Sequence, residues 1–366
     1  MEDGLPTAAL TVEQDIGAGR SHARLASLLA APILTVDGTP LTGRELVAAG
    51  TVSGRWPALE ADLRLGLLLC DEDAPADERI DRALREFRYA RRLTSGQDFR
   101  RWLAERELSL HAVRGAIARG LARSERCAPV PAAWVDRDAA VAALPAEAVC
   151  GGALRDCGWW LADRLLALAT HERGGAAIDT GRVHDVAAAE AQLLAVEASG
   201  EPEDERVRRL ARILAADAAH AERAAQVVGA DAIARLVAAR RLDWLTFELE
   251  GLVCATSSVA AEAAMQLRED RTPLAAVARV AELDVEQRML VLEDAPATLR
   301  TALTGATVGD VVGPVDADGS HEVWVVTRRA PPDAADPLIA GRAAAAALDA
   351  DRARRRAGRV QWHGRA

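Results

Sequence analysis

The central part of the chain, residues 135 to 240, consists almost entirely of Ala, Leu, Arg and Glu, and its apolar residues recur at helical spacing. Breaks occur at Gly174–Gly181 and at Ser199–Pro202. Hydrophobic residues make up 50% of the chain, but aromatic residues only 3%. Ala and Leu must therefore fill most of the core, which favours helices that pack closely through small side chains. We expect a mainly α fold.

Two residue types are missing, because the chain contains no lysine and no asparagine. Without lysine there is no phosphate-binding GxxxxGK loop and no pyridoxal Schiff base, and without asparagine there is no N-glycosylation acceptor. The formal net charge of −10 opposes binding to nucleic acid and to acidic membranes. We therefore expect no cofactor, no metal site, no nucleic-acid partner and no membrane partner.

The N-terminus and the cysteine content bear on location. Glu2 and Asp3 stand where a signal peptide would be basic. No apolar run approaches the roughly 20 residues that span a bilayer. Five cysteines are an odd number, which in a long chain is typical of a reducing compartment. These observations predict a cytoplasmic protein.

Local signals near the start predict a strand followed by helices. The apolar run Pro32–Val36 precedes the turn pair Asp37-Gly38, which favours a hairpin. Thr42 and Glu45 have the spacing of a capping box and predict a helix start. Ser109 is expected to cap a later helix that runs to about residue 121.

Composition shifts and proline-rich breaks divide the chain into five segments. A linker is expected at Cys127–Pro131, and proline residues again follow the last apolar strand pattern. The predicted segments are a lead-in at 1–31, a helical N-terminal module at 32–128, a helical middle domain at 129–242, a small α+β domain at 243–331 and a C-terminal segment with a helix at 332–366.

The pattern changes at Trp244, after which strands are expected. Leu245–Cys254 is β-like, two helices and a short apolar run follow, and another helix is expected at 295–303. Val311–Val315 and His321–Thr327 are expected to pair as a hairpin through a turn at 316–319. The order of these elements indicates a small α+β domain.

Two motifs in this domain resemble those of the parvulin-type, PpiC-like peptidyl-prolyl isomerases. The family's first strand and helix read H-I-L-V-x-[S/T]-x-x-x-A, and Gly251–Ala260 here reads GLVCATSSVA. The family's closing hairpin, G-x-V-x-x-P-V and then G-x-H-x-I-x-x-V, is matched by Gly309–Val315 and Gly319–Val326. The resemblance covers about a quarter of the chain and implies a parvulin-like fold.

The sequence departs from that family at the active site. Gly251 occupies the position of the first parvulin histidine, and the Gly-Gly-x-Leu-Gly segment is absent from residues 284–292. No Asp or Cys partner can be placed, so His321 alone remains as a vestige of the catalytic network. A single histidine cannot stabilise a twisted amide as an oriented network does. The resemblance therefore implies a degenerate, peptide-binding domain, in which the His321 ring satisfies a local backbone group.

The N-terminal module resembles that of SurA/PrsA-like foldases, which is a helical chaperone module. The residues that carry this resemblance are Ile33–Gly38, Leu41-Thr42 and Glu45-Leu46. In such proteins a helix after the parvulin domain returns to the N-terminal module, and Asp336–Arg356 stands in that place. We expect its apolar side chains to pack on aromatic residues of the module: Leu338, Ile339 and Leu348 against Phe87, Phe99 and Trp102.

Other candidate sites are weighed against ordinary structural roles. Four tryptophans are candidates for peptide binding, with a place in the core as the alternative: Trp159, Trp160, Trp244 and Trp324. Cys150 and Cys157 lack two further ligands at metal-binding spacing, so we expect buried thiols. The arginine-rich end is expected to be a solvated helix terminus, or to dock an acidic peptide or the acidic stretch 71–78 of this chain.

These features lead to three functional hypotheses. The architecture resembles the PpiC-related peptide maturation system proteins, which are encoded with pathways for ribosomally synthesised peptides (RiPP biosynthesis). The preferred hypothesis is a non-catalytic, chaperone-like accessory protein that binds a precursor peptide and possible peptide-modifying partner enzymes. The alternatives are an active prolyl isomerase and a peptide-modifying enzyme with its site in the middle domain.

Overall fold

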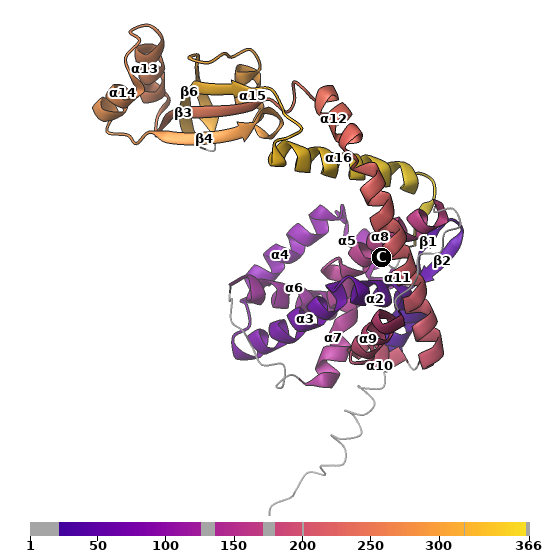
Figure 1. Cartoon of the computed structure of the whole chain (residues 1–366). Coiled ribbons are helices and arrows are strands. Elements are labelled where there is room, and N and C mark those ends of the chain that lie inside the picture. Colours follow the sequence, from indigo (N-terminus) through magenta and orange to yellow (C-terminus); the bar gives the residue numbers. More distant parts are fainter. Residues whose placement is uncertain (1–21, 126–135, 171–179, 200, 318, 364–366) are drawn as a thin grey trace, which may run out of the picture. The chain divides into compact units, whose positions relative to one another are not determined.

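A computed structural model describes residues 22–125, 136–170, 180–199, 201–317 and 319–363. They form two compact units, of which unit 1 comprises Met1–Arg223 with Arg352–Ala366 and unit 2 comprises Ala224–Asp351 (Figure 1). The expected mainly α class is confirmed, because helices dominate and the described strands form one three-stranded and one four-stranded antiparallel sheet. The expected linker at Cys127–Pro131 and most of the lead-in lie outside the described residues.

A small sheet in unit 1 joins the two ends of the described chain. Its strands are β1 (Pro32–Val36), β2 (Thr39–Thr42) and β7 (Val360–Trp362), in the order β2-β1-β7. The expected turn at 37–38 is confirmed, since both residues have positive φ angles of 49° and 77°. His363 donates its backbone N–H to the Ile33 carbonyl at 2.9 Å. Strand β7 therefore extends the sheet from the far end of the sequence.

Two of the first helices of unit 1, α2 (Gly43–Val52) and α6 (Leu110–Glu125), begin where their capping residues predict. The others are a helix at 22–30, α3 (Arg55–Glu72), α4 (Asp77–Ala90) and α5 (Gly96–Glu105). The capping box at the start of α2 is confirmed, with the Thr42 backbone N–H donating to Glu45 at 2.7 Å. The Ser109 hydroxyl accepts from the Ala112 N–H at 3.1 Å, as expected for the cap of α6.

The remaining helices of unit 1 share a core with the first ones. They are α7 (Arg137–Cys150), α8 (Ala153–Thr170), α9 (Thr180–Ala191), α10 (Leu194–Ser199) and α11 (Glu203–Val227). One buried cluster contains Leu34, Trp56, Leu144, Leu161 and Leu210. The expected division at residue 128 is therefore not a division between cores. Small residues on these helices allow them to approach closely, so that helices before and after residue 128 share one core.

Unit 2 has the expected order of helices and strands. Its elements are α12 (Ala230–Ala239), β3 (Thr246–Cys254), α13 (Ser257–Arg268), α14 (Leu274–Ala281), β4 (Glu286–Val291), a 3₁₀ turn (Leu292–Asp294), α15 (Ala297–Thr304), β5 (Val311–Ala317), β6 (Ser320–Ala330) and most of α16 (Pro337–Arg356). The sheet order is β4-β3-β6-β5, and β5 and β6 form the expected hairpin. Helices α13 and α14 lie together at one end of the sheet (Figure 1).

The apolar residues at the start of α16 do not pack as expected. Ile339 is buried within unit 2, in a cluster with Trp244 and Val291, and Leu338 is 51% exposed. The proposed receivers in unit 1 instead contact one another, with the Trp102 ring 5.5 Å from Phe87 and 6.1 Å from Phe99. Trp244 and Val291 provide the apolar surface against which Ile339 packs. The part of the C-terminal segment that joins unit 1 is the last turn of α16 and strand β7.

Candidate functional site

Position 251, where the parvulin sequence motif has a histidine, is a glycine packed against a tryptophan of the neighbouring strand. Gly251 pairs with Trp324 in the β3–β6 register. A Cβ atom on Gly251 would lie 2.5 Å from Cε3 of the Trp324 indole and 2.3 Å from the Val323 carbonyl oxygen. Trp324 itself is fully buried. A side chain at position 251 is therefore excluded by the packing, which explains why glycine stands there.

An ion pair holds the Trp324 ring in this place. The indole N–H donates to Glu322 Oε2 at 2.9 Å. Both terminal nitrogens of Arg288 donate to the same carboxylate, at 3.0 and 3.1 Å, and its guanidinium carbon lies 4.5 Å from the indole centroid. Glu322 is 7% exposed. Its carboxylate is thus committed to internal partners, as a buried charge must be.

His321 lies on the other face of the sheet. It pairs with Cys254, three residues along β3 from Gly251, and no bulge interrupts this stretch. Because side chains alternate along a strand, positions 251 and 254 face opposite sides. Nδ1 of His321 lies 2.6 Å from Asp316 Oδ1 on β5, so its partner is a carboxylate rather than the expected backbone group. The structure does not bring His321 and position 251 into one site.

The four candidate tryptophans fall into two groups. Trp244 is 2% exposed and donates its indole N–H to Glu293 Oε2 at 2.7 Å, and Trp324 is buried as described. Neither indole ring is exposed for contact with a peptide. Trp159 and Trp160 are half-buried and point in different directions on α8, as expected for adjacent helical residues.

Arginine side chains cover both half-buried tryptophans. The guanidinium of Arg356 lies 4.3 Å from the Trp159 centroid, and Trp362 of β7 packs edge-on against Trp159 at 5.2 Å. Arg164 covers Trp160 at 3.6 Å. The arginine-rich end finds acidic partners in this chain: Arg356 Nε donates to Asp163 at 2.6 Å, and Arg359 Nε donates to Asp37 at 2.6 Å.

The two cysteines of the expected buried pair are apolar in behaviour. Cys157 is fully buried and Cys150 half-buried, and burial raises the pKa of each thiol to about 12. Among the residues that the structure describes, no group of three or more His, Cys, Asp or Glu could hold a metal ion. A thiol with so high a pKa is a poor nucleophile and a poor ligand at neutral pH.

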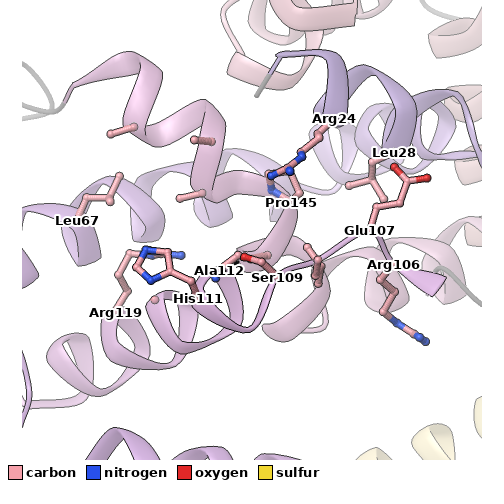
Figure 2. Close-up of a pocket in the computed structure, with 16 residues that line it drawn as sticks. Arg24, Leu28, Leu67, Arg106, Glu107, Ser109, His111, Ala112, Arg119 and Pro145 are labelled. Carbon is pink, nitrogen blue, oxygen red and sulfur yellow. Dashed lines mark hydrogen bonds between the residues drawn. The ribbon is translucent and has the colours of Figure 1, made fainter. Parts of the chain in front are cut away.

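Sequence reasoning missed a cavity in unit 1, which we call the α6–α7 pocket (Figure 2). Its volume is about 330 Å³. Alanines of α7 and leucines from three other segments form its apolar wall: Ala139, Ala142, Ala143, Ala146, Leu28, Leu67 and Leu108. Pro145 lies inside α7 at this wall and has no N–H for the Val141 carbonyl. Proline within an alanine-rich helix was the one sequence signal available.

The polar side chains that line the α6–α7 pocket are three arginines, one histidine, one serine and one carboxylate, Glu107. Arg119 forms the buried end and is paired with Glu147 at 2.9 Å. Arg24 and His111 line the cavity as exposed side chains. The Arg106 guanidinium is directed away from the pocket centre (Figure 2) and lies 4.7 Å from the Trp102 ring. The cavity therefore combines an apolar wall with exposed basic groups.

Comparisons with known proteins add little. No protein-family model and no curated protein sequence matches the chain. Two solved chains match, and one of them belongs to work that describes the virulence factor PEB4 and the periplasmic protein Cj1289 as two structurally related SurA-like chaperones in Campylobacter jejuni. The alignment covers 91% of this chain and 99% of that chain, with 9% identity and a TM-score of 0.19. At this TM-score the likeness carries no argument.

A search of the described helices for membrane-spanning segments gave none of sufficient length and apolar character.

Proposed function

We propose that the chain is a non-catalytic, chaperone-like protein that binds peptide segments. The observation that carries the proposal is the α6–α7 pocket, whose apolar wall and exposed basic groups suit a side chain of an extended peptide together with its polar backbone. Small alanines line it, so a large apolar side chain can enter without displacing the wall. The SurA-like resemblance of the N-terminal sequence agrees with this role.

The absence of isomerase activity is part of the proposal. Catalysis of prolyl isomerisation needs groups oriented around the twisted amide. Trp324 occupies the space beside Gly251, and His321 lies on the opposite face of the sheet. Unit 2 then serves as a degenerate parvulin-like domain, in which His321 is paired with Asp316 but is the only histidine between residues 224 and 351. Activity as an isomerase or as a peptide-modifying enzyme is an outcome that the experiments below can reveal.

The finer hypothesis concerns the biological setting. We propose that the bound peptide is a ribosomally synthesised precursor, that peptide-modifying enzymes are possible partners and that the protein acts in the cytoplasm. The support is the order of sequence motifs, which resembles that of peptide maturation system proteins.

A pocket-filling variant tests peptide binding. Ala142 lines the pocket and is exposed, so Ala142→Trp should fill the cavity without disturbing the core. The control is Ala221→Trp on α11, where an equally exposed alanine lies away from the pocket. Fluorescence anisotropy of a labelled unstructured peptide with spaced leucines should show at least tenfold weaker binding to Ala142→Trp, and no change for the control. Equal binding by all three proteins, or no binding by any, would overturn the proposal.

A further inference from the structure

A second cavity in unit 1 has an apolar floor and an arginine-rich rim; we call it the α8–α11 pocket. Its volume is about 380 Å³. The floor is formed by side chains from β2, α8 and α11: Leu41, Leu161, Leu165 and Ile213. The rim carries four arginines and two glutamates: Arg44, Arg208, Arg209, Arg212, Glu45 and Glu201. The rim is thus positive in a chain whose formal net charge is −10.

Both glutamates of the rim already have hydrogen-bond or ion-pair partners within unit 1. Glu45 accepts the Thr42 backbone N–H at 2.7 Å in the capping box of α2. Glu201 is paired with Arg209, which also donates to the fully buried Glu190 at 3.2 Å. Glu201 is thus compensated by Arg209, whereas Glu45 keeps its negative charge, because the Thr42 N–H that it accepts is neutral.

Two arginines of the rim, Arg208 and Arg212, are only weakly compensated by carboxylates. Arg208 donates through Nε to the Asp204 carbonyl of its own helix at 3.2 Å, and no described carboxylate lies within ion-pair distance of it. Arg212 is half exposed and reaches Glu45 only at 3.8 Å. They lie four residues apart on α11 and so share one helix face. A paired guanidinium site beside an apolar floor favours a carboxylate attached to an apolar group.

We propose that the α8–α11 pocket binds an acidic peptide segment, with an apolar side chain on the leucine floor and a neighbouring carboxylate on Arg208 and Arg212. This inference rests on the proposed function, because it takes the ligand to be a peptide, and it adds a second contact point with a charge preference. Charge complementarity selects this occupant, since a rim of four arginines and two glutamates opposes basic segments, and a wholly apolar segment would leave Arg208 without a carboxylate partner.

The test compares two peptides that differ only in charge. One is an acetylated, amidated peptide with a Leu-Glu-Leu-Glu centre in a Gly-Ser flank, and the other carries Gln in place of Glu. We expect the full-length chain to bind the glutamate peptide at least tenfold more tightly at low salt, and the preference to shrink as salt is added. The double variant Arg208→Gln/Arg212→Gln should reduce the preference to twofold or less.

A double variant on α5 serves as the matched control. Arg100→Gln/Arg101→Gln removes the same charge from exposed positions of α5 and should keep the preference. The inference is overturned if both peptides bind the full-length chain equally, or if the control loses the preference as well. If the glutamine peptide binds and Ala142→Trp abolishes that binding, the proposed function stands without this inference. If neither peptide binds, both fail.

Discussion

Substituting Gly251 with alanine tests whether Trp324 and the Val323 carbonyl close the space beside position 251. The added Cβ would lie 2.3 Å from the Val323 carbonyl oxygen, and real Cβ atoms essentially never come within 3.0 Å of a heavy atom. Strands β3 and β6 or the indole must therefore move by at least about 0.7 Å, the difference between these distances. Overpacking of this kind costs about 1–3 kcal/mol, and the lower backbone entropy of alanine returns about 0.5–1 kcal/mol. A net loss of about 1–2 kcal/mol is expected.

Native-state hydrogen exchange of the full chain measures this loss locally. A loss of 1–2 kcal/mol corresponds to roughly 5–30-fold faster exchange of the protected β3 and β6 amides. Gly305→Ala is the control, because no atom lies within 4 Å of its Cβ position and its backbone is right-handed helical. Its effect should stay within about 0.5 kcal/mol. Unchanged exchange in Gly251→Ala would refute the claim that the position is closed by packing.

Three further perturbations follow from unit 1. Burial raises the pKa of the Glu60 carboxyl above its usual 4.5, so the folded chain binds the proton more tightly than the unfolded chain. The contribution of Glu60 to folding stability therefore falls as pH rises above 4.5. Thermal unfolding should show the stability advantage of the unmodified chain over Glu60→Gln shrinking from pH 4 to 7, and a growing advantage would contradict this. Burial raises the pKa of the Cys150 and Cys157 thiols to about 12. At pH 7.5, iodoacetamide should therefore label both cysteines far more slowly in the folded chain than in urea. Rapid labelling of the folded chain would show that the thiols are accessible and ionised. A chain ending after Ala357 lacks β7 and the contact of Trp362 with Gly158. Backbone amides of β1 and α8 should then exchange hydrogen faster, while those of β3 and β6 keep their rates. Unchanged protection of β1 would mean that β7 does not stabilise the sheet.

Much of the local structure could be predicted from short-range signals. The pair Asp37-Gly38 favours positive φ angles, and Thr42 with Glu45 satisfies the free N–H groups of a helix start; both are confirmed because their physics lies within a few residues. The same holds for the order of elements in unit 2, which follows from alternating apolar patterns and turn residues.

The candidate site could not be predicted in the same way. The contact between Gly251 and Trp324 depends on strand register across more than 70 residues, and a shift of one residue would turn the indole to the other face. Strand β7 has three residues, too few for a periodic signal. Both pockets are made by side chains from helices that are distant in sequence, and alanine-rich faces indicate close packing without indicating which helices meet.

The central claim, peptide binding without catalysis, is tested most directly by measuring both properties on one X-Pro peptide with spaced leucines. Uncatalysed cis/trans exchange takes tens of seconds or longer at 25 °C, so an acceleration is easily detected by exchange NMR at saturating protein. We predict saturable binding of this peptide, no acceleration of its isomerisation, and nearly unchanged binding in His321→Gln. Acceleration that disappears in His321→Ala would contradict the account and identify unit 2 as a working isomerase.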